Sequence, residues 1–439
     1  MIAMLVSSLY NIVDQIFIGQ GVGMFGNAAT NVAFPLVTVC TAIALLFGIG
    51  GAANFNLNMG AGKQEEAAKF VGNAVTLLLF GGVLLCVAAR LFLEPLMWAF
   101  GATADTIDYA VTYTGITSFG FPFLILANGA GHLIRADGSP RFSMLCNLTG
   151  AVINSILDPL FIFTLGFGIA GAAWATVIGQ AVSGLMAAAY LAHYKTVSLT
   201  RQTLRPSLRR SLKIASLGAA NCFNQLAMMV AQITLNNTLT FYGALSVYGK
   251  EIPLACAGII SKVNMIFFSF TIGLSQGLQP ICSFNYGAKK YARVRETYKL
   301  ALLAASCISV AAFLCFQLFP RQIISLFGSG TPEYFHFAEQ YFRIYLFFTF
   351  LNGIQPVTTN LFTAIGKASR GVFLSLTRQI LFLLPLILIL PALFGIDGIM
   401  FAGPTADLIA AVCSLLLAAK ELRRIRSLES PLQREQPVQ

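Results

Sequence analysis

The stretch GGAANFNLNMGAGK, residues 50–63, returns in altered form as GLQPICSFNYGAKK, residues 277–290. The two stretches lie 227 positions apart and share an Asn-x-Gly-Ala motif at the same place. The same offset aligns FGIAGAAWA (167–175) with FGIDGIMFA (394–402). A constant offset between distant segments is hard to produce by chance, even in apolar sequence. We therefore predict that the chain consists of two related halves.

Composition places these halves in a membrane. Hydrophobic residues make up 57% of the 439 residues and charged residues 10%, and the mean hydropathy is +0.76. A water-soluble chain of this length could not bury so much apolar surface. The apolar runs are long and do not alternate with polar residues, so helices are favoured over a β-barrel. The predicted fold class is an all-α integral membrane protein.

Twelve apolar segments are long enough to be membrane spans. Six spans in each half make the halves parallel repeats, that is, two six-helix lobes related by a pseudo-two-fold axis along the membrane normal. The first segment is short for a span, and we expect a few more residues ahead of Met1. The predicted spans are 1–18, 27–53, 68–92, 112–134, 142–165, 169–193, 211–242, 252–279, 294–319, 337–363, 370–393 and 396–419.

The basic residues predict the orientation. Alternate connections and the C-terminal tail hold 22 of the 28 Lys and Arg residues, so the positive-inside rule places both termini in the cytoplasm. The net charge of +11 is therefore a topology signal, and a nucleic-acid surface is not expected. We predict an N-terminal lobe at 1–193, a basic cytoplasmic connection at 194–210, a C-terminal lobe at 211–420 and a cytoplasmic tail at 421–439.

Several chemistries find no support in the sequence. The nine cysteines fall within apolar runs without a CxxC pair, as expected of small buried side chains. No GxxxxGK[ST] motif is present to bind ATP. His132, His193 and His336 all lie near span ends, so an enzyme with a histidine base inside the membrane is not expected. We predict a protein that is not an enzyme, needs no cofactor and draws its energy from an ion gradient or from a partner.

Two carboxylates stand inside predicted spans of the first half. Asp14 follows Tyr10 by four residues, and Asp158 follows Asn154 by four, so each carboxylate shares a helix face with a polar partner. Pro159 frees a backbone carbonyl next to Asp158. Burying an ionisable group in hydrocarbon costs free energy, so we take a functional role as the first hypothesis for each carboxylate. The oxygens would suit Na⁺, and the carboxylates would equally suit a proton.

Purely structural roles remain open for some of the polar residues of the first half. Asp158 could lie near an aqueous interface and serve only as a cap or a pairing group. Asn128 and Thr176 are single polar residues in spans, which often do no more than join helices.

The second half carries a different set of charges inside its spans. We expect Arg378 or Lys262 to pair with Asp407, since each charge alone would be expensive. Such a pair could lock the bundle or take part in coupling or substrate contact. Other polar residues could line a cavity beside it: Asn224, Gln225, Gln276 and Gln279.

Together these residues resemble the multidrug and toxic compound extrusion (MATE) family of cation-coupled antiporters, over essentially the whole chain. The closest likeness is to the prokaryotic branch named for a DNA-damage-inducible member, in particular its Gram-positive-type multidrug efflux subgroup. The motifs that carry the resemblance are LYNIVDQIFIGQGVG (9–23), NMGAGK (58–63), LIRADGSPR (133–141), INSILDPLFIF (153–163), GIAGAAWAT (168–176) and SQGLQPICSFNYGAKK (275–290).

The resemblance implies where the coupling cation binds. That branch keeps its cation site in the N-terminal lobe, and its ligands fall on Tyr10, Asp14, Asn128, Asn154, Asp158 and Thr176. A sodium ion would be held by Asp14, Asn154, Asp158 and Thr176. The Na⁺-driven branch has acidic residues in its seventh and tenth helices. Here the seventh predicted span has Asn221, Asn224 and Gln225 but no carboxylate, and the tenth has Asn352 and Asn360. A cation site of that type is therefore not expected in the second half.

The expected function follows. The chain should be a monomer in the bacterial inner membrane that exports cationic, amphiphilic small molecules in exchange for H⁺ or Na⁺. A flippase of lipid-linked precursors from the same superfamily is the alternative. It would need a basic cavity for phosphate groups, to which Lys262 and Arg378 could contribute, although the carboxylates of the first half argue against it.

Overall fold

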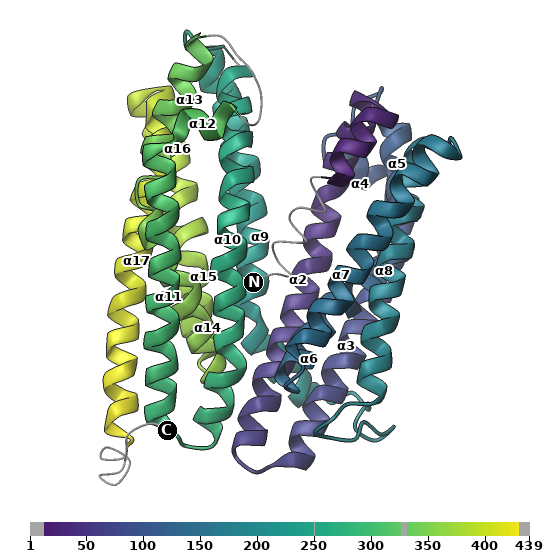
Figure 1. Cartoon of the computed structure of the whole chain (residues 1–439), viewed down its shortest axis with the longest axis vertical. Coiled ribbons are helices and arrows are strands. Elements are labelled where there is room, and N and C mark those ends of the chain that lie inside the picture. The colour runs from purple at the N-terminus through teal and green to yellow at the C-terminus, as the bar shows by residue number, and fades with distance from the viewer. Residues whose placement is uncertain (1–12, 250, 326–331, 430–439) are drawn as a thin grey trace. The chain divides into compact units, whose positions relative to one another are not determined.

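The computed structural model describes residues 13–249, 251–325 and 332–429, and all of its regular elements there are helices (Figure 1). A helix covers residues 13–21 and leads into α2. The next elements are α2 (Met24–Gly60), α3 (Gln64–Leu91), α4 (Leu93–Ala99), α5 (Ile107–Thr117), α6 (Phe121–Ala136), α7 (Pro140–Pro159), α8 (Gly168–Ala192) and α9 (Leu208–Ala244). They are followed by α10 (Glu251–Gly287), α11 (Tyr291–Leu318), α12 (Pro320–Ser325), α13 (Pro332–Tyr345), α14 (Ile354–Ala364), α15 (Ala368–Leu376), α16 (Leu384–Phe394) and α17 (Ile396–Ser427).

The chain forms two compact units, Ile2–Gln225 and Leu226–Gln439. They divide inside α9, because the first turns of this helix pack closely on α2. A Cβ placed on Gly218 would lie 1.8 Å from the carbonyl oxygen of Leu46, and one placed on Gly50 would lie 1.9 Å from that of Ile214. The lobe boundaries predicted at 193, 210 and 420 stay a prediction.

Ten helical segments of the described residues are long and apolar enough to cross a membrane. They match ten of the twelve predicted spans and confirm the all-helical membrane fold class. Of the other two, the span at 1–18 falls mostly outside the described residues. The span at 337–363 is interrupted: α13 ends at Tyr345, a 3₁₀ turn covers Thr349–Leu351, and α14 begins at Ile354.

The sequence repeat is reproduced in the helix bounds. Adding 227 to the bounds of α2 gives 251–287, the bounds of α10, and adding it to those of α3 gives 291–318, the bounds of α11. The turn that joins α2 to α3 also repeats in the turn that joins α10 to α11. Lys63 and Lys290 each donate a backbone hydrogen bond of 2.8 Å to the carbonyl five residues earlier. Gly62 and Lys289 stand at the matching left-handed position, with φ of 75° and 59°.

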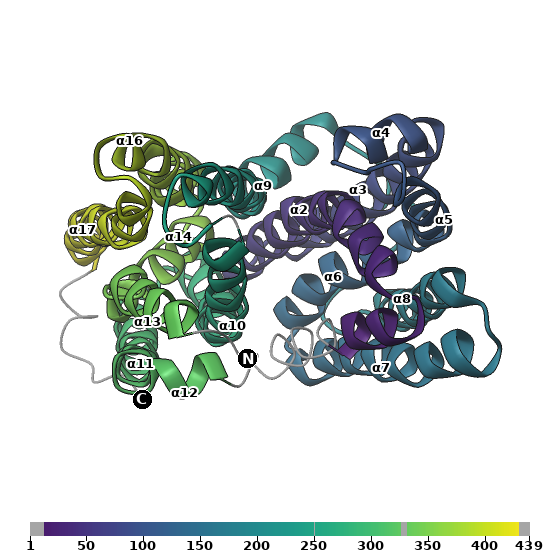
Figure 2. The same ribbon diagram turned by 90° about the horizontal axis from the view of Figure 1, so that it is seen from above.

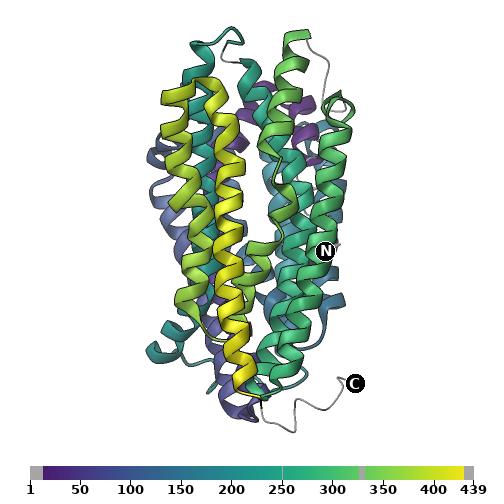
Figure 3. The same ribbon diagram turned by 90° about the vertical axis from the view of Figure 1, so that its left-hand side faces the viewer.

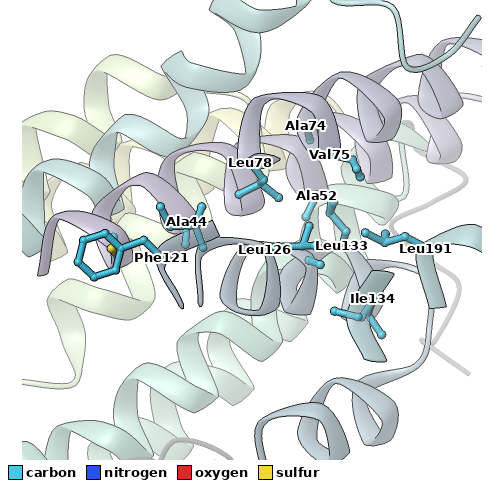
Figure 4. Close-up of a cluster of buried hydrophobic side chains, with 14 of the residues drawn as sticks. Ala44, Ala52, Ala74, Val75, Leu78, Phe121, Leu126, Leu133, Ile134 and Leu191 are labelled. Atoms are coloured by element: carbon cyan, nitrogen blue, oxygen red, sulfur yellow. The ribbon is translucent and has the colours of Figure 1, made fainter. Parts of the chain in front are cut away.

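In the first unit, α2 packs against α3 and α6, and α8 packs against α6 and α7. Small residues permit the close crossings, as is usual for helices in membranes. A Cβ on Gly48 would lie 2.6 Å from the carbonyl oxygen of Gly129. Ala44, Ala52, Ala74, Leu78 and Leu133 belong to the apolar cluster that fills the space between these helices (Figure 4).

In the second unit, α10 packs against α11 and α14, and α17 packs against α14 and α16 (Figure 3). The core here is more aromatic. Phe337, Tyr341 and Phe342 are fully buried on α13, and Phe316 meets Phe342 edge to face at 5.5 Å between ring centroids. This aromatic packing fixes the segment around the break in the tenth predicted span.

Candidate functional site

The candidate site begins where α7 loses its regular hydrogen bonds. Asp158 is the penultimate residue of α7, and Pro159 ends the helix. Proline has no N–H to donate, and the chain continues as a π-helical turn over Leu160–Thr164. Asp158 is completely buried, and Asn154 lies one turn earlier on the same face. The local sequence therefore places a carboxylate beside irregular backbone inside the bundle.

The helix at residues 13–21 packs onto this π-helical turn. A Cβ on Gly21 would lie 2.1 Å from the side chain of Ile162, and Phe17 meets Phe163 edge to face at 6.4 Å. Ile18 is fully buried in the same small apolar cluster as Ile162. These contacts fix the helix so that the carboxyl groups of Asp14 and Asp158 lie within hydrogen-bonding reach of each other.

Asn154 joins the carboxylate pair to α8, which lies beside α7 (Figure 2). In the amide orientation that satisfies both of its ends, the nitrogen donates to Asp158 Oδ2 at 2.9 Å. Its oxygen accepts from the backbone N–H of Thr176 at 3.1 Å and from the Thr176 hydroxyl at 3.3 Å. Four of the six residues predicted from the resemblance, Asp14, Asn154, Asp158 and Thr176, are thus brought together.

The Asp14–Asp158 pair has no neighbouring positive charge among the described residues to balance it. Asp14 is 7% exposed, and its Oδ1 is buried without a hydrogen-bond donor among the described residues. No ion pair formed within the described ranges reaches Asp14 or Asp158. Two adjacent buried carboxylates cannot both stay charged without compensation. A proton or a bound cation can supply it, so the arrangement can act as a cation-binding site.

Three further residues of the first half need comment. Tyr10 lies outside the described residues. Asn128 is half-buried on α6, and none of the hydrogen bonds in the described part of the chain connects it to the other four. Sequence reasoning missed Gln180, one turn beyond Thr176 on α8, whose Oε1 is buried without a donor in the described ranges. Its spacing of four residues from Thr176 was the available signal.

In the second unit, Arg378 and Asp407 form an ion pair, as predicted. The Asp407 side chain is buried, and that of Arg378 is 12% exposed. The centroid of the Phe268 ring lies 5.7 Å from the Arg378 guanidinium carbon, and the Asn352 side chain hydrogen-bonds to Asp407. The sequence did not predict the contact of Asn352 with Asp407. Lys262, the other candidate partner of Asp407, is exposed on α10.

The predicted cavity residues lie on two helices. Gln276 and Gln279 are buried on α10, and Asn224 and Gln225 are half-buried on α9. That they line a cavity stays a prediction.

The repeat places this ion pair at positions that carry no charge in the first unit. At the offset of 227 that aligns 167–175 with 394–402, Asp407 corresponds to Gln180 on α8 and Arg378 corresponds to Ala151 on α7. Beside these two positions, a Cβ on Gly150 or on Gly179 would lie 2.7 Å from the carbonyl oxygen of the other, so α7 and α8 cross closely there. The second half therefore holds two opposite charges where the repeat places none in the first half.

An all-helical membrane protein with two repeated halves and a buried carboxylate pair has the architecture of a secondary transporter. The chain belongs to the MatE family, whose model matches residues 1–160 and 223–389, one segment in each half. The family's members are transporters, so the chain is assigned to a class of multi-pass membrane transporters.

Known relatives agree with this assignment. The multidrug export protein MepA of Staphylococcus haemolyticus is 26% identical over 418 residues, covering 95% of this chain and 90% of that protein. MepA of Staphylococcus aureus is 24% identical over the same shares. A solved MOP superfamily transporter from Pyrococcus furiosus superposes with a TM-score of 0.89 at 23% identity, covering 97% of this chain and 95% of that one. An outward-facing multidrug resistance MATE transporter also has a TM-score of 0.89, at 24% identity over 98% of this chain and 95% of that one.

Proposed function

We propose that the chain is a multidrug exporter of the bacterial inner membrane that exchanges cationic, amphiphilic compounds for H⁺ or Na⁺. The single observation that carries the proposal is the buried Asp14–Asp158 pair, joined through Asn154 to Thr176. A structural protein would have no need of two uncompensated carboxylates in its interior. The name of the staphylococcal relatives, multidrug export protein, supports the substrate class.

The coupling follows from charge compensation. The pair binds a cation from outside, which lowers the cost of keeping both carboxylates buried and favours one conformation of the first half. Release of the cation to the cytoplasm restores the other conformation. Exchange needs only that the cation and the drug favour different conformations or compete for one site, and this is alternating access.

The two candidate ions make different demands on Asn154. A proton bound by the carboxylates leaves the amide free to keep donating to Asp158, as it does in the structure. A sodium ion needs oxygen ligands, so the amide would have to rotate and present its oxygen. Thr176 would then donate to a different group or turn its own oxygen to the ion.

The membrane placement is part of the proposal. The chain would act as a monomer with both termini in the cytoplasm, and its lobes would be 1–193 and 211–420, joined by the connection 194–210. The basic residues of alternate connections support this orientation.

Ethidium transport into everted membrane vesicles, whose cytoplasmic face points outward, tests the function. Wild-type protein should export the dye when a pH gradient or a Na⁺ gradient is imposed, and Asp14→Asn should abolish the response to the gradient. Asp108→Asn is the matched control, because Asp108 is an exposed carboxylate of the same unit. Gradient-driven efflux that survives Asp14→Asn unchanged would show that the pair is not the coupling site.

The flippase alternative is not favoured by the geometry. Arg378 is neutralised by Asp407, and Lys262 is exposed on α10, so the two do not form a basic cluster. Transport of a lipid-linked sugar without transport of cationic dyes would nevertheless identify a flippase in the same vesicle assay.

A further inference from the structure

The connection between the halves is held firmly against α3. The Asn73 side chain donates to the carbonyl of Arg205 at 3.1 Å and accepts from the backbone N–H of Ser207 at 2.8 Å. Thr76 donates to the carbonyl of Leu204 at 2.8 Å. A Cβ on Gly72 would lie 2.3 Å from the carbonyl oxygen of Thr203, so the two backbones are in direct contact. These contacts make residues 203–207 a fixed part of the first unit.

This fixed segment and the start of α9 carry four basic side chains that face solvent. Arg201, Arg205, Arg209 and Lys213 are spaced four residues apart, are exposed and have no ion-pair partner in the described ranges. The neighbouring Arg210 does have one, Glu66, at 3.4 Å. No acidic residue occurs in the sequence between Asp158 and Glu251, so the positive charge is not balanced locally.

Exposed apolar side chains lie directly beside these charges. Leu208 is 78% exposed and Leu212 is 61% exposed. They are four residues apart on the first two turns of α9, next to Arg209 and Lys213, which are also four apart. Because α9 is a candidate membrane span, its first turns lie at the membrane boundary. Leucines that can enter the acyl chains next to cations at the phosphate level are typical of an interfacial segment.

We propose that residues 201–213 bind the headgroup of an anionic phospholipid in the leaflet where α9 begins. The cations supply the attraction to phosphate, the two leucines supply the acyl contact, and α3 holds the backbone in place. Inorganic phosphate would bind the cations alone, because it has no acyl chain to contact Leu208 and Leu212. The inference is independent of drug export and of the coupling ion.

Lipid binding can be measured directly on the purified full-length protein. It is titrated in neutral detergent with phosphatidylglycerol, with phosphatidylcholine and with inorganic phosphate, and bound molecules are counted by native mass spectrometry. The test variant is Arg205→Gln, Arg209→Gln and Lys213→Gln combined. The control removes the same charge from exposed positions of the second unit, with Lys299→Gln, Lys420→Gln and Arg423→Gln combined.

We expect phosphatidylglycerol to bind the wild type and the control alike, and to bind the test variant about fivefold more weakly for each cation removed. Leu208→Ser with Leu212→Ser should weaken lipid binding and leave phosphate binding unchanged. Equal losses in the test and control variants, or wild-type binding by the test variant, would overturn the proposal. So would inorganic phosphate binding as tightly as the lipid. A melting curve in phosphatidylcholine verifies that each variant is folded. If the wild type binds phosphatidylglycerol but does not transport ethidium in response to an ion gradient, the result counts against the proposed function and leaves the lipid proposal intact.

Discussion

At the scale of single residues, Thr176 offers a mild test of the cation site. Its hydroxyl donates to the Asn154 oxygen, which helps to hold the amide against Asp158. Thr176→Val removes this bond, which is worth about 1 kcal/mol. We expect the ion concentration for half-maximal efflux to shift by roughly fivefold. Ser183→Ala is the control, because Ser183 bonds to the Cys146 carbonyl across the same two helices at 2.8 Å. An equal shift in both variants would point to general loosening of α7 and α8.

The ion pair of the second unit gives a stability prediction. Asp407→Asn leaves Arg378 buried without a counter-charge, and breaking a buried pair in this way costs about 3–5 kcal/mol. Thermal melting in detergent should show a large drop, and the double change Arg378→Met with Asp407→Leu should recover most of it. The reference is the ion pair at 3.6 Å between Arg321, which is exposed, and Glu339, which is half-buried. Glu339→Gln should cost less than about 1 kcal/mol. A small drop for Asp407→Asn together with lost transport would instead assign the pair to substrate or coupling.

At the scale of helices and turns, the turn between α10 and α11 contains backbone strain that a single substitution can relieve. Lys289 has φ of 59°, where its partner in the first half is Gly62. A side chain in this left-handed region costs about 1–2 kcal/mol, so Lys289→Gly should raise the melting temperature. Lys290→Gly removes the same charge at a φ of −85°, where glycine brings no relief and a flexibility penalty. Equal melting temperatures for the two variants would contradict the strain argument.

The crossing of α2 and α9 is predicted to be intolerant of any side chain. The Cβ introduced by Gly218→Ala would overlap the backbone oxygen of Leu46, so the helices must separate, at a cost of about 1–3 kcal/mol or more. Gly258→Ala is the matched control on α10, because nothing lies within 4 Å of its Cβ. It should be neutral or slightly stabilising, since alanine is the better helix former. Folded yields in detergent and melting curves will distinguish the two variants.

Hydropathy predicted the helices well and their irregularities poorly. The spans at 27–53 and 294–319 became α2 and α11 because apolar length alone specifies a membrane helix. The break between Tyr345 and Ile354 was not predicted, since residues 346–351 are apolar apart from Thr349. It arises where Gly353 meets α11, with Ser309 Oγ 2.8 Å from the position of a Cβ. Such a break depends on a neighbouring helix, which no local pattern reports.

At the scale of the whole molecule, the orientation can be tested chemically. In a background without reactive cysteines, Arg205→Cys should be labelled by a membrane-impermeant maleimide only from the cytoplasmic side, and Thr103→Cys only from the outside. Both positions are exposed, and they lie on connections of opposite predicted side. Labelling of both positions from the same side would refute the predicted topology, and labelling with the sides exchanged would invert it.

Sequence alone identified the residue types of the candidate site but not its full membership. The pairing of Asp14 with Asp158 and the link to Thr176 agree with what the family resemblance implied. Asn128 shares the resemblance and still stands apart, because the direction in which α6 presents it depends on packing. Arg378 rather than Lys262 reached Asp407 for the same reason: both lie in apolar spans, and only the tertiary fold decides which one faces inward.

The ion pair of the second half, at positions that are uncharged in the first half, has an electrical consequence. Arg378 is a positive charge covalently tethered beside Asp407, so the second half carries a counter-ion that cannot dissociate. The carboxylates that we propose for ion exchange, Asp14 and Asp158, both belong to the first half. If the proposed site binds one ion per cycle, exchange of a singly charged drug for one H⁺ or Na⁺ moves no net charge across the membrane. Efflux of such a drug is then expected to follow the ion gradient and to be indifferent to membrane voltage.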